Sequence, residues 1–191
     1  GENKRDYPAS IFYQSAWYKQ YRYMEDYFAR FHVATDGTPS DCKLLVMNPI
    51  ESVWARTYTG CFQWIQSNDE GISAIEYEET FRMLMGAGID FDYGEERILA
   101  GHGSVENGKL KVGSCTYDKV LLSGVETMKE STWKLLKEFV AQGGKLIVAG
   151  KAPEMIHAEP DVRMTELMEH AEKIPFTKEA VTESCALEAP L

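Results

Sequence analysis

The sequence predicts an α/β fold with a mainly parallel central sheet and helices on both faces. Four short apolar runs carry this prediction, and each stops at a turn or loop signal. The runs span residues 43–47, 89–93, 119–123 and 145–149. Three of them are nearly continuous in Leu, Ile and Val, as expected of strands buried on both faces. Because segments with helical periodicity separate the runs, the alternation of strand and helix predicts parallel pairing.

An aromatic amphipathic helix is expected before the first strand. Between residues 7 and 34, apolar side chains recur at three- and four-residue spacing, which places them on one face of a helix. These side chains are Trp17, Tyr21, Met24, Tyr27, Phe28 and Phe31. So much aromatic surface needs a partner, either the sheet of this chain or another domain. The turn-rich stretch 35–41 then separates an N-terminal segment, 1–40, from a domain over 41–191.

A long loop, residues 48–71, is expected after the first strand, at the edge of the sheet where α/β folds bind ligands. It combines aromatic rings with polar side chains. A sugar has apolar C–H faces that stack on such rings and hydroxyls that bind such polar groups, so the loop is a candidate carbohydrate site. Its candidate residues are Asn48, Glu51, Trp54, Tyr58 and Trp64. The same aromatic residues could instead fill the core.

The remaining elements follow from periodicity and from glycine positions. Helices are expected over residues 72–87, 95–99, 129–141, 162–172 and 178–187. In the first of these helices, the expected buried stripe consists of Ile75, Phe81, Leu84 and Met85. Asn107-Gly108 predicts a tight hairpin that ends in the strand 110–112.

An acidic cluster surrounds the end of the second predicted strand. It consists of Asp90, Asp92 and Glu95. Alternation along a strand places Asp90 and Asp92 on one face, where two carboxylates could form an acid–base pair or a cation site. The same residues could instead cap the following helix or face solvent.

Composition and motifs exclude several classes of function. The chain has 30 acidic and 20 basic residues and a net charge of -10, which argues against binding to nucleic acid or an anionic membrane. No apolar run is long enough to predict a membrane span. Neither a phosphate loop nor a dinucleotide-binding glycine motif is present, and no cofactor is predicted. The four cysteines lack metal-binding spacing, so no metal site is predicted, and unpaired thiols favour a cytoplasmic location.

A free-standing enzyme stays an alternative. Cys61 or Cys115 would then be the nucleophile of an amidotransferase or hydrolase, with one of the four histidines as its base. Neither cysteine lies in the strand-to-helix motif that such a nucleophile needs.

Three segments resemble large bacterial glycoside hydrolases related to family 2 and family 42 β-galactosidases and to some rhamnosidases. They are DYPASIFYQSAWY at 6–18, NPIESVW at 48–54 and GIDFDYGEE at 88–96. The resemblance implies that the N-terminal segment is the tail of a catalytic barrel. The rest is then similar to a class I glutamine-amidotransferase-like domain with a flavodoxin-like fold, which is the trimerisation domain in family 42.

The resemblance also implies a function. The chain would be a non-catalytic companion domain that packs on the barrel of the same polypeptide and shapes its rim or mediates homo-oligomer contacts. The parent would hydrolyse O-glycosidic bonds with two carboxylates that lie outside this chain, so no catalytic residue is assigned. The absence of an initial Met fits an excised domain.

Overall fold

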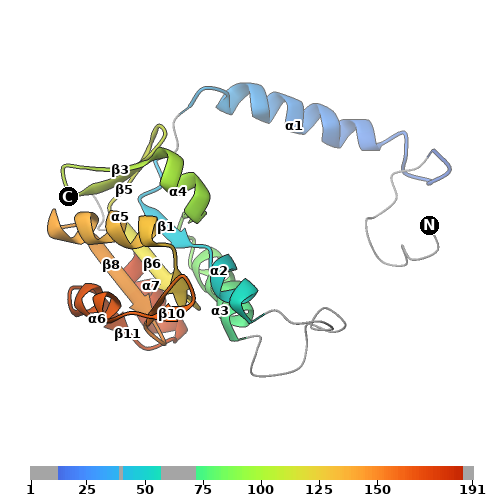
Figure 1. Cartoon of the computed structure of the whole chain (residues 1–191). Helices are drawn as coiled ribbons and strands as arrows, with labels where there is room; N and C mark the ends of the chain where they lie inside the picture. The colour runs from blue at the N-terminus through green and yellow to red at the C-terminus, as the bar shows by residue number, and fades with distance from the viewer. Residues whose placement is uncertain (1–12, 39–40, 57–71, 187–191) are drawn as a thin grey trace. The chain divides into compact units, whose positions relative to one another are not determined.

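The computed structural model describes residues 13–38, 41–56 and 72–186, without the side chains of 72–75 (Figure 1). The chain divides into two compact units, residues 1–39 and 40–191. The first unit contains the helix α1, Tyr21–Thr35, and none of its residues is buried.

The second unit is built on a five-stranded sheet in the order β2-β1-β6-β8-β11, and all neighbouring strands are parallel. The strands are β1 Leu44–Met47, β2 Asp92–Gly94, β6 Lys119–Ser123, β8 Lys145–Ala149 and β11 Glu172–Ile174. Numbered along the chain within this sheet, the order is 2-1-3-4-5, which is the flavodoxin-like topology. The predicted α/β fold with a flavodoxin-like sheet is therefore confirmed.

Helices cover both faces of this sheet (Figure 1). They are α2 Ile50–Ala55, α3 Ile72–Gly86, α4 Glu96–His102, α5 Glu130–Ala141, α6 Val162–Glu169 and α7 Lys178–Cys185. Because strand side chains alternate, Leu45 and Val120 join a core cluster with residues of α4, α5 and α6. Val46 and Leu121 point the other way and join a second cluster with residues of α3 and α7.

Two small sheets flank the central one. The strands β3 Gly103–Glu106, β4 Lys109–Val112 and β5 Cys115–Tyr117 form an antiparallel meander. Asn107 and Gly108 both have positive φ in its first turn, which confirms the predicted hairpin. The strands β7 Thr127–Met128, β9 Met155–Ile156 and β10 Glu159–Pro160 form the other small sheet, in which β9 pairs with both neighbours.

The structure corrects several boundaries. The second strand begins at Asp92 rather than Ile89, because residues 87–89 close the end of α3 through backbone hydrogen bonds such as Ile89 N–H to Leu84 C=O. The expected helix 162–172 ends at Glu169, and the edge strand β11 replaces its last part. A short helix, α2, occupies the start of the expected loop 48–71.

The buried stripe of α3 is also corrected. Leu84 is buried as expected, but Phe81 and Met85 are exposed, and the side chain of Ile75 lies outside the described residues. Thr80 takes the inward position instead, with its hydroxyl 2.8 Å from the buried Ser123 hydroxyl. The stripe is therefore partly polar, which apolar periodicity alone does not predict.

Candidate functional site

A flavodoxin-like sheet places its ligand site where the strand order reverses, beyond the carboxyl ends of the first and third strands. In this chain those strands are β1, which ends at Met47, and β6, which ends at Ser123. The segments that follow them are α2 and the stretch that leads into β7. A ligand site is therefore expected between these two segments.

Ser52 joins the two segments from inside. It lies in α2 and is buried, and its hydroxyl oxygen accepts hydrogen bonds from the backbone N–H groups of Glu126 at 2.8 Å and Thr127 at 3.1 Å. The same hydroxyl lies 3.3 Å from the Thr127 carbonyl oxygen, to which it donates. Arg56 reinforces the junction with guanidinium nitrogens 2.6–2.8 Å from the Glu126 carboxylate. The junction is therefore a fixed polar contact between residues at least seventy positions apart.

A cleft of about 340 Å³ opens beside this junction. It is lined by Glu51, Trp54, Ala55, Thr127, Met128, Lys129, His157 and Ala158. We call it the switch-point cleft. Its walls come from α2, from β7 with the residue that precedes α5, and from the turn between β9 and β10.

The charged groups in the cleft pair with each other. The Lys129 ammonium lies 2.6 Å from Glu51 Oε1. That oxygen is buried, and no aligned hydrogen bond from the described residues reaches it, so the ammonium is its electrostatic partner. Beneath the cleft, the buried Glu96 carboxylate accepts hydrogen bonds from the Lys129 backbone N–H at 2.7 Å and from the Thr132 hydroxyl. Burial raises the pKa of Glu96, and these two hydrogen bonds offset part of that rise.

One wall of the cleft has a strained backbone. His157 and Ala158 form the two-residue turn between β9 and β10, with φ of 54° and 63°. Residues with a Cβ rarely adopt this left-handed conformation. The turn is held by hydrogen bonds from the Ala158 N–H to the Thr127 hydroxyl at 2.8 Å and from the His157 N–H to the Met128 carbonyl at 3.0 Å. Strain of this kind tends to persist at functional positions.

Two of the predicted carbohydrate residues, Glu51 and Trp54, line the cleft. Asn48 is not among the lining residues, and its backbone N–H donates to the Gly94 carbonyl at 3.0 Å. Tyr58 and Trp64 lie outside the described residues.

The predicted acidic residues have separate surroundings. Asp90 is exposed and precedes β2, so the alternation argument does not apply to it. Asp92 accepts a hydrogen bond from the Tyr117 hydroxyl at 3.0 Å. Glu95 caps α4 by accepting from the Ile98 N–H at 2.9 Å. Within residues 13–38, 41–56 and 72–186, no group of three or more His, Cys, Asp or Glu could hold a metal ion.

Sequence reasoning missed Thr127, Lys129 and His157 as site residues. No motif marks them, and they lie far along the chain from Glu51. Only the strand order brings them together, because β6 lies next to β1 and the β9–β10 turn reaches back to β7. For the alternative enzyme, Cys115 lies in the antiparallel strand β5, and Cys61 is outside the described residues.

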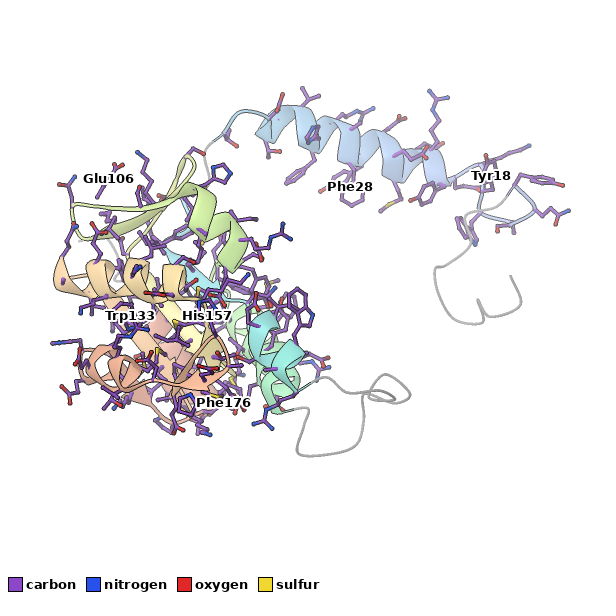
Figure 2. The ribbon with its side chains drawn as sticks, in the orientation of Figure 1. Tyr18, Phe28, Glu106, Trp133, His157 and Phe176 are labelled. Carbon is purple, nitrogen blue, oxygen red and sulfur yellow. The ribbon has the colours of Figure 1, made fainter. Side chains whose placement is uncertain are left out.

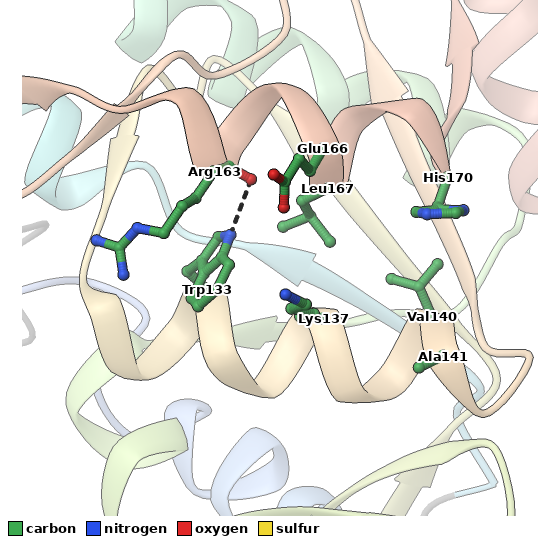
Figure 3. A pocket seen from close by; sticks show the side chains of 8 residues that line it. All are labelled: Trp133, Lys137, Val140, Ala141, Arg163, Glu166, Leu167 and His170. Atoms are coloured by element: carbon green, nitrogen blue, oxygen red, sulfur yellow. Dashed lines mark hydrogen bonds between the residues drawn. The ribbon is translucent and has the colours of Figure 1, made fainter.

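A second hollow of about 250 Å³ lies between α5 and α6 (Figure 3). Trp133 lies at its base and donates its indole N–H to the Arg163 carbonyl at 3.2 Å. The Arg163 guanidinium and the Lys137 ammonium each lie 4.9 Å from the Trp133 ring centroid. The two contacts of Arg163 with Trp133 fasten α6 to α5, so the hollow is explained by helix packing.

Comparison with protein-family models and with curated proteins finds no match to this chain. Within the part of the chain that the structure describes, no helix has the length and apolar character needed to cross a membrane.

Proposed function

We propose that this chain is a non-catalytic companion domain of a glycoside hydrolase, and that its aromatic helix packs on the catalytic barrel of the same polypeptide. The barrel would supply the two carboxylates that hydrolyse the glycosidic bond. The α/β unit would support the barrel, shape its rim or hold copies of the enzyme together. The family part of this proposal rests on the three sequence segments that resemble such hydrolases.

The observation that carries the companion role is the exposed apolar surface of α1. Met24, Tyr27, Phe28 and Phe31 are each 50–60% exposed, and they recur at three- and four-residue spacing. Figure 2 shows Phe28 among the side chains that α1 projects outward. We call these four residues the aromatic face. Burial of one such side chain stabilises an assembly by about 1.5–3 kcal/mol, so four of them form a strong docking surface.

The carboxyl edge of the sheet supports a non-catalytic role. Ser123, at the end of β6, is buried and hydrogen-bonded to Thr80, which does not suit a nucleophile. Ser52 is likewise engaged with the backbone of the segment after β6. Where described, these hydroxyls hold the fold rather than face an open cleft.

The test compares this chain with a longer polypeptide that includes the preceding barrel, using p-nitrophenyl glycosides as substrates. We expect the longer polypeptide to hydrolyse at least one of them and the 191-residue chain to hydrolyse none. Turnover by the 191-residue chain alone would contradict the proposal.

Variants of the helix test the docking role separately. The double variant Phe28→Glu with Phe31→Glu places two charges on the aromatic face, and we expect it to lower the thermal stability and the activity of the longer polypeptide. Val33→Glu is the matched control, because Val33 is exposed and lies nine residues, or two and a half turns, from Met24 on the opposite side of α1. Equal effects of the double variant and the control would contradict docking through the aromatic face.

A further inference from the structure

We propose that the switch-point cleft binds a neutral sugar, with Trp54 as the stacking platform and the Glu51–Lys129 pair as the group that recognises two adjacent hydroxyls. This site goes beyond the companion role. It does not depend on a barrel, because all of its proposed contacts come from the 40–191 unit.

The electrostatics of the cleft favour a neutral ligand over a phosphate or a nucleotide. The two cations at the switch point are already paired, Lys129 with Glu51 and Arg56 with Glu126. The backbone N–H of Lys129, at the start of α5, could otherwise donate a hydrogen bond to an anion, but it already donates to Glu96. A phosphate would therefore have to displace a carboxylate, and the net charge of -10 would further oppose it.

The Glu51–Lys129 pair provides a hydrogen-bond acceptor and a hydrogen-bond donor for two adjacent sugar hydroxyls. Glu51 Oε1 is buried against the Lys129 ammonium, but the Glu51 side chain as a whole is 21% exposed, so its second carboxylate oxygen can accept a hydrogen bond from a hydroxyl. The Lys129 ammonium has three donors, and its ion pair with Glu51 at 2.6 Å leaves at least two of them for a ligand. An acceptor and a donor side by side match the O–H donor and the oxygen acceptor of two neighbouring sugar hydroxyls.

Trp54 supplies the apolar part of the site. Its side chain lines the cleft and is 58% exposed, so its ring is open to a ligand. An exposed indole face can stack on the C–H face of a pyranose, while the adjacent charged pair binds its hydroxyls. The strained His157–Ala158 turn forms another part of the cleft wall.

The experiment is a titration of the 191-residue chain with methyl β-D-galactopyranoside, methyl α-L-rhamnopyranoside and methyl β-D-xylopyranoside, followed by calorimetry and by saturation-transfer NMR. We expect at least one glycoside to bind at millimolar concentration. Trp54→Ala should weaken that binding about tenfold or more, which corresponds to ~1.4 kcal/mol. Glu51→Gln should also weaken glycoside binding, because an amide pairs less strongly with the Lys129 ammonium and leaves the ammonium free to reorient.

Trp17→Ala is the matched control, because Trp17 is also exposed, at 46%, but belongs to the other unit. We expect it to bind the glycoside like the unaltered chain, and we expect inorganic phosphate not to compete. Three results would overturn the proposal: no binding of any glycoside, equal binding by the Trp54→Ala variant, or displacement of the glycoside by phosphate. Failure of this site would leave the companion role standing, and loss of the companion role would leave this site standing.

Discussion

Removal of the Ser52 hydroxyl should destabilise the 40–191 unit, because that hydroxyl forms hydrogen bonds with buried backbone groups where α2 meets the segment that leads into β7. In a Ser52→Ala variant, the N–H groups of Glu126 and Thr127 lose their acceptor, and the Thr127 carbonyl loses a donor. An unsatisfied buried polar group costs roughly 1–3 kcal/mol. With two N–H groups affected and partial relaxation of the loop, we expect a loss of about 2–4 kcal/mol in the free energy of unfolding.

Urea denaturation followed by circular dichroism measures this loss as a lower midpoint at an unchanged slope. The matched control is Ser131→Ala, which makes the same substitution at an exposed position of α5. Its stability should lie within about 0.5 kcal/mol of the unaltered chain. If Ser52→Ala also lay within that range, the hydroxyl would not hold the junction, and the reasoning would be refuted.

Three further predictions concern backbone strain, packing and charge. Ala158→Gly should raise the free energy of unfolding by about 0.5–1 kcal/mol, because glycine relieves the left-handed φ at some cost in unfolded-chain entropy; a lower melting temperature would contradict this. Gly144→Ala should destabilise the chain by about 1–3 kcal/mol, since its Cβ would lie 2.2 Å from the buried Phe139 ring. In the same urea assay, Gly101→Ala should stabilise the chain, because Gly101 is exposed in the last turn of α4 and its Cβ would meet no neighbour within 4 Å. Glu96→Gln keeps a hydrogen-bond acceptor and removes the titrating group. The stability of the unaltered chain relative to this variant should therefore be greatest below pH 4.5 and should fall as the pH rises through the raised folded pKa of Glu96. If urea midpoints over a pH series showed that this stability difference increases with pH, the burial argument would be contradicted.

The parallel core of the fold was predictable because its strands are marked by composition. The strands β1, β6 and β8 are short runs of Leu, Ile and Val that are buried on both faces, and this burial requires such residues. The strand β11 was missed because it is a polar strand, Glu172-Lys173-Ile174, at the edge of the sheet, where β8 is its one partner among the described residues. Charged residues at an edge protect against aggregation, and they also remove the apolar signal.

The two tight hairpins show the same contrast. Asn107-Gly108 is the residue pair that a two-residue turn with positive φ favours, so the first hairpin was predictable. The second hairpin places His157 and Ala158 in the same conformation, against their preference, and it is held in place by Thr127 and by the Met128 carbonyl. A turn imposed by tertiary contacts cannot be found from local sequence.

The candidate site follows the same physical logic. Glu51 and Trp54 could be proposed from the sequence because they follow a predicted strand within one short segment. Lys129 and His157 could not be proposed, because their place beside Glu51 depends on which strands are neighbours in the sheet. Strand order is a long-range property that four apolar runs do not determine.

The central claim is that the aromatic face of α1 is buried against a neighbouring domain, and hydrogen–deuterium exchange of the α1 amides tests it most directly. We expect the amides of residues 21–35 to exchange rapidly in the 191-residue chain, where none of these residues is buried. In the longer polypeptide they should be strongly protected, and Phe28→Glu with Phe31→Glu should abolish that protection while Val33→Glu should not. Equally fast exchange of α1 in both polypeptides would contradict the claim.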